Sequence, residues 1–310
     1  MPLVVPGPSL LPQNIPLALT LMIASSLLFA LGVTIQHYAV GRTVDTAADS
    51  RHLGLRQVLG LLTNPRWLGG IAVAAGGSAF HILGLMMAPV TVVQPVGILA
   101  VPWSVLLAAR IHHYRPTRRT WAAVCLTIAG IASFTLISTR NAAPDTALPP
   151  WGILIGSVVV FAVAAGFGLL GRFGRHSLRC IMWASGGSFC YGLSSALIKA
   201  LSEMVSQPGV FGRPLIWGVM AGMLACYAFG GWMIQQSYAN GPAEIVVGSM
   251  TTTDPIVAVA FGIVVLGEGA LIGALDGLGM ALSGAVAVTG VVILSKLHPA
   301  SQRDQVPAVS

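Results

Sequence analysis

The sequence predicts an all-α polytopic membrane protein with nine transmembrane helices, ten being the alternative, arranged as two inverted-repeat halves. Three observations lead to this fold class: the apolar runs, the sorting of charges along the chain, and an internal repeat. Asp, Glu, Lys and Arg make up only 8% of the 310 residues, against about 25% in an ordinary soluble domain. A separate soluble domain is excluded, because no stretch outside the apolar runs is long enough to bury a core.

Nine apolar runs are each long enough to cross a bilayer as a helix. Roughly 20 apolar residues span the ~30 Å hydrocarbon core. Lipid offers backbone groups no hydrogen-bond partner, so such runs must be helical. The runs cover residues 16–40, 66–87, 89–111, 118–138, 151–171, 180–201, 214–238, 242–267 and 270–294.

The segment 50–64 between the first two runs is ambiguous. It is short for a span and carries Arg56 in its middle. Its leucines predict a helix that lies along the cytoplasmic surface with its arginines toward lipid head groups. A tenth span is the alternative interpretation.

Basic residues are sorted to one side of the predicted membrane. Thirteen of the 16 Lys and Arg residues fall in odd-numbered connections or after the last run, two fall in even-numbered connections, and Lys199 lies within a run. The positive-inside rule places the basic side in the cytoplasm. We therefore expect an external N-terminus, a cytoplasmic C-terminus and an odd number of spans, in the cytoplasmic (inner) membrane of a bacterial-type cell.

Two stretches of the chain, 86–111 and 239–266, read alike. Pro89 and Pro102 are 13 residues apart, as are Pro242 and Pro255, and both members of the second pair follow the first by 153 residues. The copies are the third and eighth runs, an offset of five spans, so their directions through the membrane should be opposite. This predicts a first half at 1–145 with four spans and the surface helix, a second half at 146–296 with five spans, and a polar cytoplasmic tail at 297–310. Inverted halves favour alternating access to a site at mid-depth.

Few charged residues lie inside the runs, and Asp254 is the strongest functional candidate among them. A charge at the centre of a membrane helix costs at least ~2.5 kcal/mol on insertion scales. Asp254 is midway along its run and just before Pro255, so it is suited to bind a cation or take up a proton. A structural role beside the loosened backbone at Pro255 is the alternative. We interpret Glu268 as a solvated loop charge, and Lys199 as a snorkelling residue paired with Glu203.

Neutral polar and aromatic residues extend the candidate substrate site. A histidine in a membrane helix relays protons or simply packs through a hydrogen bond. Aromatic residues far from helix ends are not explained as interface anchors, and they could form the walls of a pocket for an organic cation or a flat metabolite. The predicted substrate-binding residues are Asp254, Gln94, Trp103, His81, Tyr191 and Gln235, with Asp254 also as the coupling residue.

Three stretches, 25–39, 64–97 and 237–268, together resemble the drug/metabolite transporter superfamily. The shared features are the prolines of the repeat and the Gly267-Glu268 pair that closes a span. Within the superfamily the chain is similar to EamA-type permeases and to the nine-span NIPA-like magnesium transporters. The resemblance extends over residues 16–295. It implies secondary transport of a small metabolite through a central cavity between two inverted halves.

The expected function is therefore a secondary transporter that moves a small metabolite or organic cation by alternating access, with coupling to protons through Asp254. A NIPA-like magnesium or divalent-cation transporter is one alternative, although Gly76-Gly77-Ser78 stands where those proteins carry an acidic residue. A membrane scaffold that transports nothing is another. The sequence contains no enzyme motif, metal-ligand spacing, cofactor motif or nucleic-acid module. The expected partners are the substrate and the lipid bilayer, and a homodimer stays open.

Overall fold

The computed structural model describes residues 11–44, 63–111, 115–142, 149–175, 178–241 and 243–297, and all regular structure in these ranges is helical. Eight of the described segments are long and apolar enough to cross a membrane, which makes this a multi-pass membrane protein. The elements are α1 (Ile15–Val44), α3 (Pro65–Met87), α4 (Val90–Val93), η1 (Gln94–Leu99), α5 (Ala100–Ile111), α6 (Arg118–Arg140), α7 (Pro150–Phe173), α8 (Arg179–Val205), η3 (Val210–Gly212), α9 (Pro214–Asn240), α10 (Ala243–Val264) and α11 (Ala274–Leu297).

The first two long helices, α1 and α3, pack antiparallel through small residues. The Ser25 hydroxyl of α1 donates to the carbonyl of Gly77 on α3 at 2.7 Å, and Asn14 donates its backbone N–H to Met87 at 3.0 Å. A low residue number on α1 therefore meets a high one on α3. Because lipid supplies no hydrophobic drive between helices, such close backbone approach is what holds membrane helices together.

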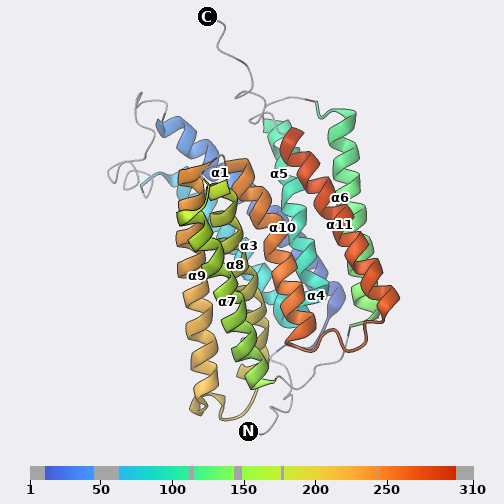
Figure 1. Cartoon of the computed structure of the whole chain (residues 1–310). Helices are drawn as coiled ribbons and strands as arrows, with labels where there is room; N and C mark the ends of the chain where they lie inside the picture. Colours follow the sequence, from blue (N-terminus) through green and yellow to red (C-terminus); the bar gives the residue numbers. More distant parts are fainter. Residues whose placement is uncertain are drawn as a thin grey trace, which may run out of the picture.

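Two groups of helices flank the middle of the bundle. In Figure 1, α7, α8 and α9 lie on one side, while α6 and α11 lie side by side on the other. Between these groups, α10 contacts both α4 and η1. The two copies of the sequence repeat therefore meet in the middle of the molecule.

The segment 90–111 is not one kinked helix but three short pieces. Four residues of α-helix (α4) lead into six of 3-10 helix (η1), and α5 continues to residue 111. Pro95 lacks the N–H that an α-helix needs at that position. A mid-span stretch of 3-10 helix often marks a functional hinge or a strained sequence.

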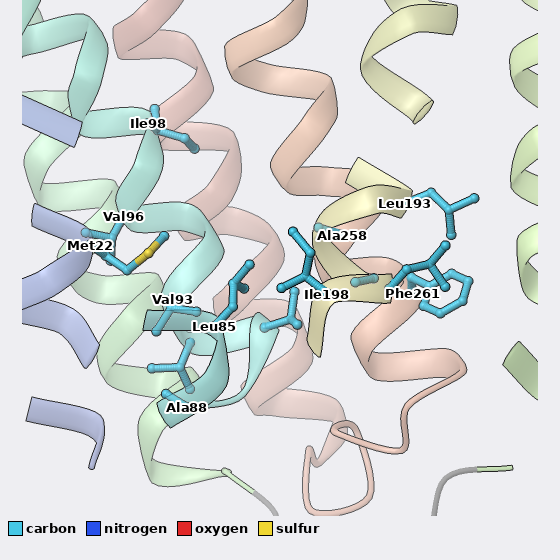
Figure 2. Packing of buried hydrophobic residues seen from close by; sticks show 14 of the residues in the cluster. Met22, Leu85, Ala88, Val93, Val96, Ile98, Leu193, Ile198, Ala258 and Phe261 are labelled. Atoms are coloured by element: carbon cyan, nitrogen blue, oxygen red, sulfur yellow. The ribbon is translucent and has the colours of Figure 1, made fainter. Parts of the chain in front are cut away.

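The apolar core joins the two copies of the repeat. Val93 belongs to the first copy and Leu85 to the helix before it, α3. Leu193 comes from α8, and Ala258 and Phe261 come from α10 in the second copy (Figure 2). All five side chains are buried. The close contact between the copies holds the polar side chains of α10 and η1 in fixed register.

The helix α8 differs from the other long helices in its composition. It spans 27 residues, corresponds to the apolar run 180–201, and is mostly buried among its neighbours. Gly, Ser, Lys199 and Glu203 lower its hydropathy, and it is not among the eight segments that meet the length and apolarity of a span. Its crossing of the membrane, and hence the count of nine, remains a prediction.

Several boundaries differ from the apolar runs. The run 270–294 becomes α11 at 274–297, because residues 267–273 form turns that begin at Gly267 with a φ of 80°. Positive φ is a conformation that glycine adopts without steric cost. The predicted surface helix at 50–64 and the predicted tail at 297–310 lie almost entirely outside the described residues.

Candidate functional site

Asp254 lies at the middle of a continuous helix. It is the twelfth of the 22 residues of α10, so it stands about 16 Å from the start of that helix at 1.5 Å per residue. Many protein atoms surround it, yet part of its side chain stays exposed. No Lys, Arg or His of the described residues forms an ion pair with it. A membrane carboxylate without a counter-charge needs a proton or a cation to offset its cost.

Gln94 binds this carboxylate from the opposite copy of the repeat. Its amide Nε2 donates to Asp254 Oδ1 at 3.1 Å and to the Ser195 hydroxyl on α8 at 3.3 Å. Three elements, η1, α8 and α10, therefore converge at one point. Because Gln94 is the first residue of η1, the break in the helix is what presents its side chain at this depth.

The carbonyl oxygen of the same Gln94 amide has no hydrogen-bond partner among the described residues. Gln94 is only 2% exposed, and its Oε1 is buried without a hydrogen bond. An unsatisfied buried acceptor costs about 1–3 kcal/mol. One 3-10 turn further on, a side chain at Gly97 would meet nothing within 4 Å, and residues i and i+3 of a 3-10 helix lie over each other. There is open space next to the face that carries Gln94.

A close helix–helix approach fixes the height of Asp254. A methyl group at Gly192 of α8 would stand 2.6 Å from the Asp254 carbonyl oxygen and 2.8 Å from Val257 Cβ. No real Cβ fits there without a shift of backbone. Glycine at 192 therefore lets α8 and α10 touch at the level of the carboxylate.

Tyr191 borders the same region from α8. Its ring lies 6.0 Å from that of Tyr227 on α9, and the next residue of the chain, Gly192, meets the backbone of Asp254. Both tyrosines are away from helix ends. Aromatic faces at a carboxylate attract cations through their quadrupoles.

Trp103 and His81 lie elsewhere, along α1. The Trp103 indole N–H donates to the Ser26 hydroxyl at 3.2 Å. The His81 ring meets the ring of Phe29 edge-on, with centroids 6.4 Å apart. The structure shows no contact of either residue with Asp254, so it does not bring the six predicted residues into one site.

Gln235 is exposed on α9 and makes no hydrogen bond with the described residues. The structure therefore unites Asp254 with Gln94 and places Tyr191 nearby. It leaves Gln235, like Trp103 and His81, outside this group. A substrate-binding role for these three residues stays a prediction from sequence.

Glu268 is buried, which corrects its interpretation as a solvated loop charge. Its two carboxylate oxygens accept the backbone N–H groups of Val90 at 2.7 Å and Thr91 at 2.8 Å. These are donors that the first turn of α4 leaves free. Burial raises the pKa of Glu268, while the bonds from Thr91 and Val90 and the charge of Lys199 act in the opposite direction. A residue of the second copy thus caps a helix of the first.

Lys199 forms the expected ion pair but does not snorkel. Its Nζ lies 3.1 Å from Glu203 Oε1, and its side chain is only 4% exposed. The pair was predictable from the i,i+4 spacing. Its burial was not, because it depends on α8 being surrounded by other helices.

Two residues of the site were missed from sequence. Ser195 follows Tyr191 by four residues, so the two share a face of α8, and this spacing could have placed Ser195 near the aromatic pair. For Glu268 the sequence predicted a solvated loop charge at the Gly267-Glu268 pair, not a buried cap. Its role depends on a contact with residues 177 and 178 positions away, for which the sequence carries no local signal.

Comparison with known proteins gives one relative of similar length. A Corynebacterium glutamicum protein, itself named only as uncharacterized, is 26% identical over 284 residues, which cover 90% of this chain and 95% of the relative. No protein-family model matches the chain. No solved structure matches it.

Proposed function

We propose that this protein is a secondary transporter of the drug/metabolite type, moving a small metabolite or organic cation across the cytoplasmic membrane by alternating access. The observation that carries the proposal is the mid-helix carboxylate of Asp254, which has no counter-charge among the described residues and binds a glutamine of the opposite repeat copy. A partly exposed acid in the middle of a membrane helix is costly, so a protein without a function at that site would have little reason to keep it.

The arrangement of the repeat supports alternating access. The start of α4 meets residues late in α10, through Thr91 and Gly262, while Gln94 meets the earlier Asp254. These two contacts support copies that run in opposite directions, as inverted halves require. The proposed topology has nine spans with an external N-terminus.

Coupling to protons follows from the chemistry of one carboxylate. Asp254 is neutralised either by a proton or by a cationic substrate, but not by both together. Exchange of the proton and the substrate at an alternating site would move the substrate in the direction opposite to the proton flow. A charged, empty carboxylate would be costly, which favours crossing only in the neutralised states.

The test is flux in proteoliposomes driven by a pH gradient. Asp254→Asn should abolish flux, because the amide neither binds a cation strongly nor exchanges a proton. Asp276→Asn is the matched control: Asp276 is exposed in the first turn of α11, and its variant should transport normally. Unchanged flux in Asp254→Asn would overturn the proposal. Magnesium flux that needs no proton gradient would support the divalent-cation alternative instead.

A further inference from the structure

The groups that meet at Asp254 offer hydrogen-bond acceptors and almost no free donors. Asp254 Oδ2 takes part in no hydrogen bond with the described residues, and Gln94 Oε1 has none either. Both belong to groups joined by the 3.1 Å bond between Nε2 and Oδ1. Two acceptors thus stand next to each other, one of them ionisable.

The direction of the Gln94 amide is set by its neighbours. A carboxylate accepts but does not donate, so the NH₂ end must face Asp254 Oδ1, and the second amide proton goes to Ser195. The carbonyl end is left as the second acceptor. The orientation follows from chemistry and does not depend on which amide atom is drawn as oxygen.

A third acceptor lies one turn away on the same face of α10. The Thr251 hydroxyl donates to the Val247 carbonyl at 2.8 Å, so its proton is committed and only its lone pairs remain. Residues three apart on a helix share a face, which puts Thr251 beside Asp254.

From these contacts we propose that the site recognises a cation bearing N–H groups, a protonated primary or secondary amine, and selects it over quaternary ammonium ions. The single carboxylate of Asp254 balances one positive charge, and the neighbouring Gln94 carbonyl can accept a hydrogen bond from a second N–H group of the same cation. The tyrosine pair at 6.0 Å suits an organic body attached to the nitrogen. A bare divalent ion would need about six oxygen ligands. This inference rests on the transport function proposed above.

Protonation would remove the negative charge of Asp254 and, at the same time, occupy the carbonyl of Gln94. A protonated Asp254 carries an O–H donor, toward which the Gln94 carbonyl can turn by rotation of the amide. The Ser195 hydroxyl, which donates to no described acceptor, can then donate to that carbonyl as well. The proton and the amine therefore compete for the charge of Asp254 and for the orientation of Gln94.

Three probes with the same ring and the same charge test the inference: benzylamine, N,N-dimethylbenzylamine and benzyltrimethylammonium. In water near neutral pH their nitrogens carry three, one and no N–H groups. Kd is measured by calorimetry on the purified full-length protein. Benzylamine should bind at least about tenfold tighter than the quaternary ion, as expected for one hydrogen bond to a charged donor. The dimethyl compound should lie between them.

Gln94→Met keeps the length of the side chain but removes the carbonyl. This substitution should bring the ratio of the benzylamine and benzyltrimethylammonium affinities close to one, mainly by weakening the binding of benzylamine. Gln236→Met, at a half-buried glutamine of α9 that is not among the predicted substrate-binding residues, is the matched control and should leave the ratio unchanged. Size-exclusion profiles confirm that each variant is folded.

Several outcomes would overturn the inference. They are equal or tighter binding of the quaternary ion by the wild type, an unchanged ratio in Gln94→Met, or no binding of any probe. Tight quaternary binding that Asp254→Asn abolishes would reject the selectivity but leave the transport proposal standing. Proton-driven flux that survives Asp254→Asn would reject the transport proposal itself.

Discussion

The segment 90–111 and helix α10 each start just after one proline and contain another proline 13 residues further on, yet the first is broken and the second is continuous. Pro102 and Pro255 occupy equivalent places, so a mid-span proline does not by itself break the helix. The first copy also has Pro95 and Gly97, where the second has Gly248 and Met250. A second proline within eight residues removes another N–H and leaves a stretch that fits 3-10 better than α-helix.

The turn before Pro255 in the second copy is rich in hydroxyl groups. Pro255 leaves the Thr251 carbonyl without its usual donor, and the hydroxyls of Thr251 and Thr252 donate to the Val247 and Gly248 carbonyls one turn earlier. These two bonds use the hydroxyl protons locally and do not reach the Thr251 carbonyl. The comparison shows that the first copy is broken at Gln94, which donates the hydrogen bond between the copies. The second copy is a continuous helix at Asp254, which accepts that bond.

The largest expected effect comes from moving the extra proline to the second copy. Gly248→Pro places a proline six residues into α10, where it removes a backbone hydrogen bond and clashes with the preceding turn. The free energy of unfolding should fall by about 3 kcal/mol. Thermal or denaturant unfolding in detergent measures the loss.

Gly248→Ala is the control for that substitution. A methyl group there would lie 3.9 Å from the Ser295 hydroxyl oxygen, an ordinary contact. Alanine favours helix over glycine by about 1 kcal/mol, so this variant should be at least as stable as the wild type. Equal stability of the two variants would show that α10 already tolerates a break at that point.

A smaller loss is expected from the Glu268 cap at the start of the first copy. Glu268→Ala leaves the N–H groups of Val90 and Thr91 without acceptors, at about 1–3 kcal/mol each. Release of the buried carboxylate offsets part of this cost, and we expect a net loss of about 2 kcal/mol. Glu268→Gln keeps one acceptor oxygen and should fall between the alanine variant and the wild type. Melting temperatures in that order support the cap, whereas a wild-type value for the alanine variant contradicts it.

The smallest effect on stability is expected from restoring the first copy toward the second. Pro95→Ala returns one N–H donor to the backbone and should change stability by less than about 1 kcal/mol. It should nevertheless lengthen α4 at the expense of η1 and turn Gln94 away from Asp254. Hydrogen exchange at residues 95–99 reports the change in helix type, and benzylamine affinity reports the loss of the contact. Unaltered exchange would mean that packing, and not Pro95, imposes the 3-10 turn.

Much of this architecture was predictable because lipid makes the rules strict. Length and apolarity decide where a helix must form, so the long helices fall within a few residues of the apolar runs. Asp254 stood out because a charge in such a run is costly. The partner Gln94 was identified as polar and mid-span, although its pairing with Asp254 was not foreseen.

What the sequence did not show depends on how the helices are arranged in space. The burial of Glu268 arises because the turn after α10 folds back onto the first turn of α4, and no local pattern encodes that approach. Trp103 looked like a pocket wall, but its indole bonds to Ser26 because α5 lies against α1. Hydropathy indicates that a residue is inside the bundle, but not which neighbour it faces.

The two hydrogen bonds that Glu268 accepts from Val90 and Thr91 affect which conformation such a carrier would adopt at rest. The residue that stands in the repeat-equivalent position, 153 places earlier, is Arg115, an exposed cation with no carboxylate to offer. Two halves that rocked about a shared centre would then be fastened at one rim and not at the other. Opening the fastened rim would first break the two hydrogen bonds of Glu268 to Val90 and Thr91, so the state with that rim shut keeps both bonds.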